Sequence, residues 1–236
     1  MHGLETALGE VRRLAQALDA RPPAARVAIC PPATLLSRLS QAVSGTRIEV
    51  GGQDCRPENS GPFTGDIAPE MLVDAGATLV ILGHSERRTL HHETDAQVSA
   101  KVAGALRAGL APVVCVGESL EDHRAGRAVR TVERQVRGSL AGAPLRAPLA
   151  IAYEPLWAIG SGQVPTLHEI EEVHRAIRFN LVEMFGESGR SIPLLYGGSV
   201  KGSNAAEILA CENVDGALVG GGSLRAADFI AIIHAA

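Results

Sequence analysis

Aromatic residues are scarce in this chain, which has one tryptophan, two tyrosines and four phenylalanines among its 236 residues. Its hydrophobic content is nevertheless 46%. The core must therefore be built from alanine, valine, isoleucine and leucine. A chain of this length can form either one large domain or two small ones.

A large excess of either sign of charge is also absent. The net charge is −4, and acidic and basic residues are mixed along the chain. Because a nucleic-acid surface needs a clustered basic face, we expect no nucleic-acid partner. The sequence has no apolar run near 20 residues and no basic segment followed by a long apolar one. We therefore expect no membrane association and a cytoplasmic protein.

The cysteines are few and far apart, with no C-x-x-C spacing. They are Cys30, Cys55, Cys115 and Cys211. This spacing favours buried free thiols over a disulfide or a metal site. The chain also lacks an H-E-x-x-H spacing and the glycine-rich nucleotide fingerprints. We expect neither a cofactor nor a metal.

Short apolar runs alternate with longer amphipathic segments along the whole chain. Each run has about five residues and is apolar on both faces, which is typical of strands in a covered parallel sheet. The predicted strands are Arg26–Cys30, Arg47–Gly51, Thr78–Leu82, Pro112–Val116, Leu149–Tyr153, Pro193–Tyr196 and Asp215–Val219. Helical periodicity is clearest in Leu4–Leu18, Thr94–Ala108 and Leu167–Phe185.

The limits of some helices can be read directly. Thr166 begins "TLHE", a capping-box pattern, and Gly76 and Gly109 stand where helices should end. His91 and His92, and the acid-rich run 168–175, are interpreted as solvated helix surface. Repeated strand–helix alternation predicts one α/β domain over residues 1–236 with right-handed crossovers.

Two layouts satisfy this alternation. A closed (β/α)8 barrel is natural near this length, and a doubly wound open sheet is the alternative. The chain opens with a helical segment, and the predicted strands number seven. Because a closed barrel needs eight, we expect that the first strand is missing from this chain.

Two polar residues come directly after predicted strands, where α/β proteins place their functional groups. His84 follows Thr78–Leu82, and a histidine there either points into a pocket or only ties down its own loop. Glu154 follows Leu149–Tyr153 and is either a general base or half of a structural ion pair.

The residues after Glu154 favour the catalytic interpretation. Pro155 and Trp157 stiffen the start of this segment, residues 160–162 (Gly-Ser-Gly) make its middle flexible, and Val164 and Pro165 stiffen its end. A stiff-ended segment with a glycine-rich middle is typical of a lid that covers a substrate and excludes water.

The last two predicted strands both run into glycine-rich turns, "YGGSV" at Tyr196–Val200 and "VGGGSL" at Val219–Leu224. Glycines let the backbone approach a ligand, and helix N-termini behind them would direct N–H groups at a phosphate. Barrels often bind phosphate after their last two strands. Simple tight turns are the alternative, and two such turns together favour phosphate.

Several of these segments together resemble the triosephosphate isomerase family, and the resemblance covers essentially the whole chain. They are "ILGHSERR" at Ile81–Arg88, "AYEPLWAIGSG" at Ala152–Gly162, the two glycine-rich turns, "GPFTGD" at Gly61–Asp66, "CVGE" at Cys115–Glu118 and "HETD" at His92–Asp95. The resemblance implies a (β/α)8 barrel that interconverts dihydroxyacetone phosphate and D-glyceraldehyde 3-phosphate through an enediol(ate), in glycolysis and gluconeogenesis.

The resemblance also implies roles for individual residues. Glu154 would move the proton between the two carbons. His84 would polarise the carbonyl and move protons between the two substrate oxygens, and Glu86 would lie just behind the site. The phosphate would be held by the backbone of Gly160, Ser199, Gly220 and Gly221. The protein would be a homodimer in which Thr64 reaches into the partner subunit, with Gln53 at the same interface.

The start of the chain departs from the family pattern. The family begins with a strand ending in Asn-Trp-Lys-Met, whereas Met1-His2-Gly3 resembles the residues that come directly after that lysine. The two lysines here, Lys101 and Lys201, do not match it in position. A positive charge facing the substrate oxygens contributes strongly to catalysis.

Two alternative functions stay open. One is another enzyme that acts on a phosphosugar, which His84, Glu154 and the lid together disfavour. The other is an impaired phosphate-binding or interaction protein that lacks the lysine.

Overall fold

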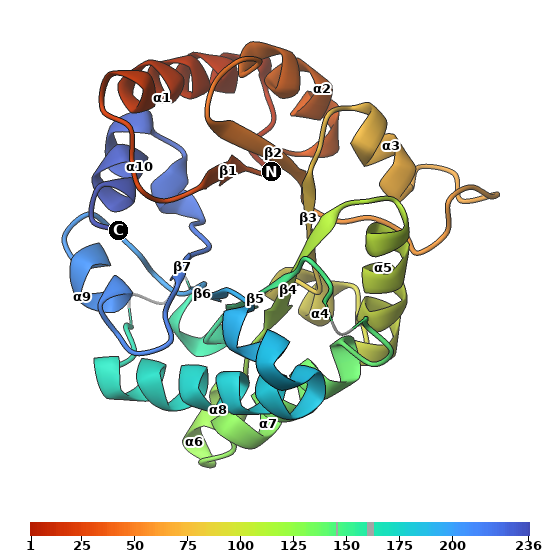
Figure 1. Ribbon diagram of the computed structural model, residues 1–236, viewed down its shortest axis with the longest axis vertical. Coiled ribbons are helices and arrows are strands. Elements are labelled where there is room, and N and C mark those ends of the chain that lie inside the picture. Colours follow the sequence, from red (N-terminus) through yellow and green to blue (C-terminus); the bar gives the residue numbers. More distant parts are fainter. Residues whose placement is uncertain (145, 160–162) are drawn as a thin grey trace.

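The computed structural model describes residues 1–144, 146–159 and 163–236. In the described chain, seven parallel strands form one sheet in the order β1-β2-β3-β4-β5-β6-β7. The strands are β1 Val27–Ile29, β2 Ile48–Gly52, β3 Leu79–Leu82, β4 Ala111–Val116, β5 Ala150–Tyr153, β6 Leu194–Tyr196 and β7 Gly216–Ala217. The sheet curves into a ring with the helices outside it (Figure 1). This is the barrel layout, because a doubly wound sheet carries helices on both faces.

The helices lie around the outside of the ring. They are α1 Leu8–Ala20, α2 Ala33–Ala42, α3 Pro69–Asp74, α4 Ser85–Leu90, α5 Asp95–Arg107, α6 Leu120–Arg124, α7 Ala128–Ser139, α8 Leu167–Phe185, α9 Ala205–Leu209 and α10 Ala226–Ile233. Helix α1 precedes β1, α10 follows β7, and the others lie between successive strands. Short 3-10 turns occur at η1 Glu5–Ala7, η2 Leu156–Ala158, η3 Gly186–Ser191 and η4 Gly221–Ser223.

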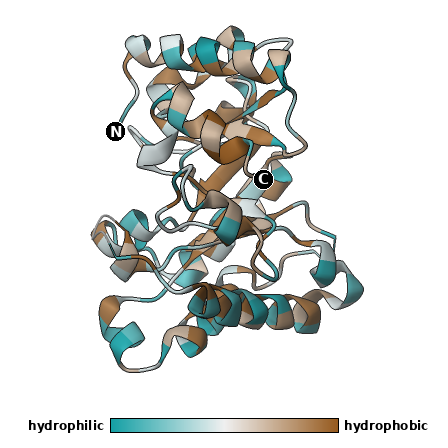
Figure 2. Cartoon of the chain, turned by 90° about the vertical axis from the view of Figure 1, so that its left-hand side faces the viewer, coloured by the Kyte–Doolittle hydropathy of each residue, from teal (hydrophilic) through white to brown (hydrophobic). Residues whose placement is uncertain are grey.

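Alternating strand residues divide the core into two apolar clusters. In β3, Val80 and Leu82 join the large cluster that contains the helix residues, whereas Ile81 joins a smaller one with Cys115 and Ala152. Because side chains on a strand alternate between faces, the smaller cluster fills the inside of the ring. Figure 2 shows the strands in hydrophobic brown at the middle of the molecule and teal residues along the outer helices.

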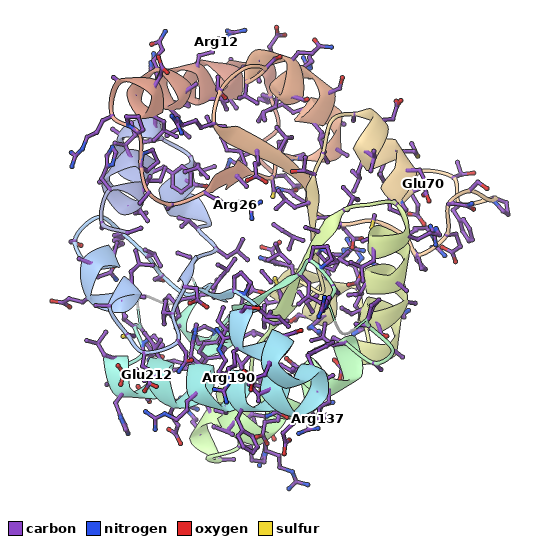
Figure 3. The ribbon with its side chains drawn as sticks, viewed as in Figure 1. Arg12, Arg26, Glu70, Arg137, Arg190 and Glu212 are labelled. Atoms are coloured by element: carbon purple, nitrogen blue, oxygen red, sulfur yellow. The ribbon has the colours of Figure 1, made fainter. Side chains whose placement is uncertain are left out.

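Charged side chains cover the periphery. The labelled Arg12, Arg137 and Glu212 lie on the outside of the ring in Figure 3, and all three are exposed. On α7, the alternation is explicit: Val132 and Val136 are buried, while Arg137 faces outward. The outer helices therefore follow the amphipathic pattern expected for a covered sheet.

The ring has a seam between its first and last strands. Among the described residues, β1 pairs only with β2, and β7 pairs only with β6. The helices nevertheless meet there, since α1 packs against α10 (Figure 1). The Glu10 carboxylate accepts the backbone N–H of Ala226, the first residue of α10, at 2.8 Å. This contact satisfies one of the free donors of that helix end.

All seven predicted strands are present, although β7 is shorter than expected. Helix α8 has the predicted limits, and Thr166 and Glu169 form the predicted capping box. Gly76 and Gly109 end their helices with left-handed φ values of 95° and 85°. The four cysteines are free thiols, as favoured, and Cys30 is the partly exposed one.

Two interpretations of histidines need correction. His91 and His92 are exposed, as interpreted, but they lie beyond the end of α4 and not within a helix, and His92 has a φ of 54°. The run 168–175 is not wholly solvated, because His174 is completely buried. Its ring Nδ1 lies 2.9 Å from the Asn213 carbonyl oxygen. Burial lowers the pKa of His174 to about 4.

We expect His174 to make the protein sensitive to acid. The unfolded chain takes up this proton as the pH falls through its ordinary value of 6.5, whereas the folded protein does so only near 4. The free energy of unfolding should therefore fall between these pH values, by about 1.4 kcal/mol for each unit of difference in pKa. Urea denaturation from neutral pH down to about pH 4 measures this slope.

The matched variants are His174→Gln, which keeps a donor for Asn213 without the titrating ring, and His168→Gln, which changes an exposed histidine on the same helix. The slope should flatten only in His174→Gln. An equal slope in all three proteins would show that His174 does not cause the acid sensitivity.

Candidate active site

Glu154 begins the loop after β5 and is almost completely enclosed, with 3% of its side chain exposed. Its backbone N–H donates to the Val116 carbonyl at 2.8 Å, so the parallel ladder with β4 extends to this residue. The strand end therefore fixes the position from which the carboxylate projects.

Glycines flank Glu154 on both sides. A Cβ on Gly117 would lie 1.7 Å from the Glu154 carbonyl oxygen, and one on Gly197 would lie 2.8 Å from its Cγ. Both approaches are closer than a side chain permits. The Gln135 amide holds Gly117 in place, accepting its N–H at 2.7 Å and donating to its carbonyl at 3.0 Å.

The Glu154 carboxylate meets donors from the loop after β3. Ser85 donates its backbone N–H to Oε2 at 2.9 Å and its hydroxyl to Oε1 at 3.1 Å. The Nε2 atom of His84 lies 3.0 Å from the same Oε1. The structure thus brings together two of the residues predicted from the sequence, and adds Ser85 between them.

His84 is the N-cap of α4, and this sets its tautomer. Its Nδ1 accepts the backbone N–H of Glu86 at 3.3 Å. A neutral ring that accepts at Nδ1 carries its proton on Nε2, which faces Glu154. The Glu86 side chain itself is exposed. Glu86 therefore contributes to the site through its backbone N–H.

The two glycine-rich turns lie side by side. A Cβ on Gly222 would come within 3.0 Å of the Val200 carbonyl oxygen, so the turns after β6 and β7 are in close contact. Gly220 and Gly221 are exposed at the start of η4, just ahead of α10. Ser199 is partly exposed, and its hydroxyl lies 3.4 Å from the Ala158 carbonyl. Gly160 lies outside the described residues.

A second buried carboxylate supports the start of the predicted lid. Glu118 is fully buried, and burial raises its pKa. Its Oε1 accepts the indole N–H of Trp157 at 2.6 Å and the hydroxyl of Tyr153 at 3.1 Å. The sequence interpretation included Glu118 only within "CVGE" and gave it no role.

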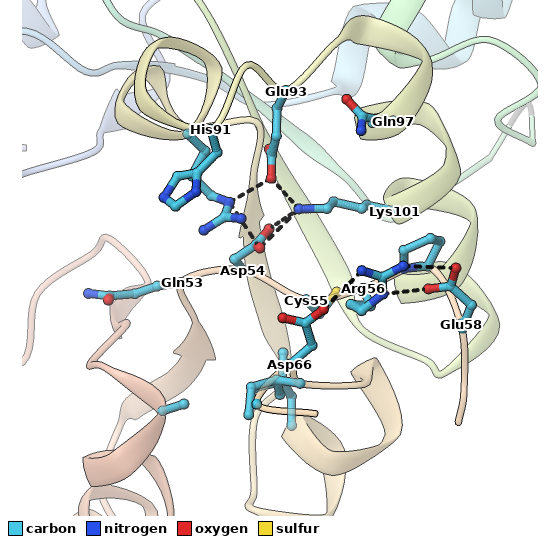
Figure 4. Close-up of a pocket in the computed structure, with 16 residues that line it drawn as sticks. Gln53, Asp54, Cys55, Arg56, Glu58, Asp66, His91, Glu93, Gln97 and Lys101 are labelled. Carbon is cyan, nitrogen blue, oxygen red and sulfur yellow. Dashed lines mark hydrogen bonds and ion pairs between the residues drawn. The ribbon is translucent and has the colours of Figure 1, made fainter. Parts of the chain in front are cut away.

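A cavity of about 560 Å³ lies beside the segment after β2, and Glu154 is not among the residues that line it (Figure 4). Lys101 crosses its wall, binding both carboxylate oxygens of Asp54 at 2.8 and 2.9 Å and also Glu93. Arg87 contacts the same two acids. Lys101 lies in α5, as its predicted position in a helix requires, and is engaged in a charge cluster.

The segment that protrudes beside α3 in Figure 1 is internally braced. The guanidinium of Arg56 lies 3.8 Å above the ring of Phe63 and forms ion pairs with Glu58 and Asp66. Thr64 is exposed on this segment. Gln53 at its base lines the cavity and donates to the Cys30 carbonyl at 2.9 Å.

Within the part of the chain that the structure describes, no group of three or more His, Cys, Asp or Glu side chains is arranged to hold a metal ion. Likewise, no helix among residues 1–144, 146–159 and 163–236 is long and apolar enough to cross a membrane.

Comparison with known proteins agrees with this geometry. The family model described as triosephosphate isomerase matches residues 2–236. This chain belongs to the triosephosphate isomerase family. It is 58% identical over 235 residues to the triosephosphate isomerase of Caulobacter vibrioides, covering 100% of this chain and 93% of that protein. The corresponding enzyme of Xanthobacter flavus is 55% identical, with 100% and 94% covered.

The solved structures agree as well. The crystal structure of triosephosphate isomerase from Bartonella henselae matches with a TM-score of 0.92 and 45% identity, covering 100% of this chain and 94% of that one. The predicted family, barrel fold and reaction are confirmed. The reaction is the interconversion of dihydroxyacetone phosphate and D-glyceraldehyde 3-phosphate, an isomerisation in glycolysis.

The close approach at Gly117 gives a sharp test of this triosephosphate isomerase site. In Gly117→Ala, the new methyl group must push the Glu154 backbone away from β4. If Glu154 is the base that the sequence predicts, we expect kcat to fall about 100-fold, because a displacement of about 1 Å at a reacting group has an effect of this size. The melting temperature should fall as well.

Gly9→Ala is the matched control, since nothing lies within 4 Å of a Cβ at Gly9 in α1. That variant should keep full activity and stability. A fully active Gly117→Ala enzyme would contradict the account of how Glu154 is positioned.

Proposed function

We propose that Glu154 is the base of the isomerase reaction and that His84 is its electrophilic partner. The observation that carries this proposal is the 3.0 Å contact between the Glu154 carboxylate after β5 and His84 Nε2 after β3, two strands that lie on either side of β4. Glu154 takes the proton from the carbon next to the carbonyl and returns it to the neighbouring carbon. The Nε2–H of His84 polarises the carbonyl, and His84 moves protons between the two substrate oxygens.

Ser85 has a part in this cycle. Both oxygens of Glu154 are engaged by Ser85 in the structure. A carboxylate oxygen has two lone pairs, so Ser85 can hold Glu154 in place while the carboxylate takes a proton from carbon.

The proposed phosphate site is the backbone of Ser199, Gly220 and Gly221, together with Gly160. The adjoining turns after β6 and β7 and the exposed glycines at η4 support it. We assign Gly160 from the sequence alone. The segment from Pro155 to Pro165 is the proposed lid, which keeps water from the enediolate during the reaction.

Full activity, we propose, requires an eighth parallel strand between β1 and β7 that carries an Asn-x-Lys motif. The sheet order supports this, because β1 and β7 are its two ends within the described chain. The two lysines here support it too, since Lys101 is held by acids and Lys201 is exposed. Activity without such a strand should be low.

The proposed oligomer is a homodimer in which Thr64 of one subunit enters the cavity beside Gln53 of the other. The braced loop around Phe63 and the volume of that cavity support this arrangement. We further propose that residues 1–236 act as one domain and that the enzyme works in the cytoplasm. The pairing of Glu154 with His84 favours the isomerase over the two alternative functions.

The base assignment is tested by Glu154→Gln, which keeps the shape of the side chain but removes its basicity. We expect kcat to fall by about 10²–10⁴, the usual contribution of a general base. The assay follows the isomerisation of D-glyceraldehyde 3-phosphate. Glu172→Gln, an exposed change on α8, should leave the rate unaltered. Near-normal activity in Glu154→Gln would remove Glu154 from the mechanism.

The strand proposal is tested by adding an N-terminal extension with an apolar strand ending in Asn-Trp-Lys. We expect this form to be faster than residues 1–236 alone by several orders of magnitude, because the lysine adds a positive charge at the substrate oxygens. An extension with alanine in place of the lysine should restore stability but not rate. Equal rates for all three forms would refute the proposal.

A further inference from the structure

His123 stacks on the only tryptophan of the chain. It belongs to α6, whose N-cap Ser119 accepts the N–H of Asp122. The rings of His123 and Trp157 lie nearly parallel, with their centroids 4.0 Å apart and their planes 20° apart. The His123 side chain is 28% exposed, so a proton can reach it from solvent.

Trp157 is held on a second side by Glu118. The indole N–H donates to Glu118 Oε1, and the backbone N–H of Leu156 donates to the Glu118 carbonyl at 3.2 Å. Trp157 lies in η2, three residues beyond Glu154. The chain between the proposed base and the indole is therefore short and closely packed, and any shift of Trp157 acts on Glu154.

Two carboxylates face His123 from different elements. Glu169 of α8 has its Oε1 3.9 Å from His123 Nε2. Glu118 lies at the N–H edge of the same indole and interacts electrostatically with His123, and its buried Oε2 has no hydrogen-bond partner within the described residues. Burial raises the pKa of Glu118, while the Trp157 and Tyr153 hydrogen bonds and the charge of His123 act against that rise.

The other charged groups near His123 either form ion pairs with other residues or shift the pKa of Glu169. On α6 and the turn after it, Asp122 and Glu121 pair with Arg127. On α8, burial acts to raise the pKa of Glu169, but the Thr166 hydrogen bonds and the charges of His123 and His168 outweigh it and lower the pKa. Arg124 is the remaining cation on α6, and it lines the same surface hollow as His123 and Trp157.

From this geometry we propose that His123 is a positioning residue whose protonation tightens the hold on Trp157 and, through it, on Glu154. The protonated ring lies over the indole face and 3.9 Å from the Glu169 carboxylate, and a positive charge attracts both groups more strongly than a neutral ring does. The neutral ring keeps only the stacking. The effect on catalysis rests on the proposed role of Glu154, whereas the effect on Trp157 does not.

The first measurement is the fluorescence of the single tryptophan as a function of pH. A stacked imidazolium quenches indole emission, so the wild type should show a transition between about pH 5 and 8. The transition should vanish in His123→Phe, which stacks without titrating, and in His123→Arg, which stays charged. His168→Gln, an exposed change beside Glu169, should retain it. A transition that persists in His123→Phe would overturn the proposal.

The second measurement is the pH profile of kcat, taken as the ratio of each variant to wild type. At about pH 6, His123→Phe should have a kcat about two- to threefold below wild type, and about equal to wild type at pH 8. His123→Arg should stay near wild type at pH 6, and KM should change little in either variant. A flat ratio for His123→Phe would show that the charge does not position Glu154.

The two readouts separate this proposal from the proposed function. Glu154→Gln should lose activity but keep the fluorescence transition, because the stack on Trp157 remains. If the wild-type protein were inactive, the fluorescence titration of the His123 variants would still support or overturn the hold on Trp157. Thermal unfolding of each variant confirms that it is folded.

Discussion

The contact between the backbones of Gly117 and Glu154 is the constraint on which the site depends. Here β4 and β5 approach so closely that no side chain fits between them. Gln135 forms hydrogen bonds with both the backbone N–H and the carbonyl of Gly117, and so prevents this strand end from moving outward. The next residue, Glu118, then lies where it can hold Tyr153 and Trp157. One close approach therefore sets the positions of both Glu154 and the start of the segment behind it.

Buried charge is the cost of this arrangement, and the structure offsets it in different ways. Glu154 is surrounded by donors from Ser85 and His84. Glu118 has two donors on one oxygen and none among the described residues on the other, which is consistent with its raised pKa. Lys101 is matched by two acids beside the cavity. Such groups are stable only where their partners are fixed, so they require a rigid surrounding structure.

Local patterns were sufficient to predict most of the fold, because strands and helices here follow short-range rules. Apolar runs marked every strand, and the capping box at Thr166 marked the start of α8.

The burial of His174 was not predicted, although the sequence contained a signal for it. His174 lies four residues after Ile170 and three before Ile177, on the buried face of α8, and the acidic residues around it obscured that spacing. Ser85, Gly117 and Gln135 were missed for another reason. Their roles arise from contacts with residues distant in sequence, which periodicity cannot reveal.

The seam between α1 and α10 has a consequence for how the ring assembles and opens. Each strand pairs with the next one along the chain, so most of the sheet can form from neighbouring segments. The bond from Glu10 to Ala226 instead joins residues 216 positions apart. Bringing such distant segments together carries the largest loss of chain entropy and comes late in folding. Opening the folded ring at this seam breaks no strand pairing of the described sheet, so it disrupts the least structure. Transient opening and amide exchange should therefore begin where α1 meets α10 and spread from there into the neighbouring elements.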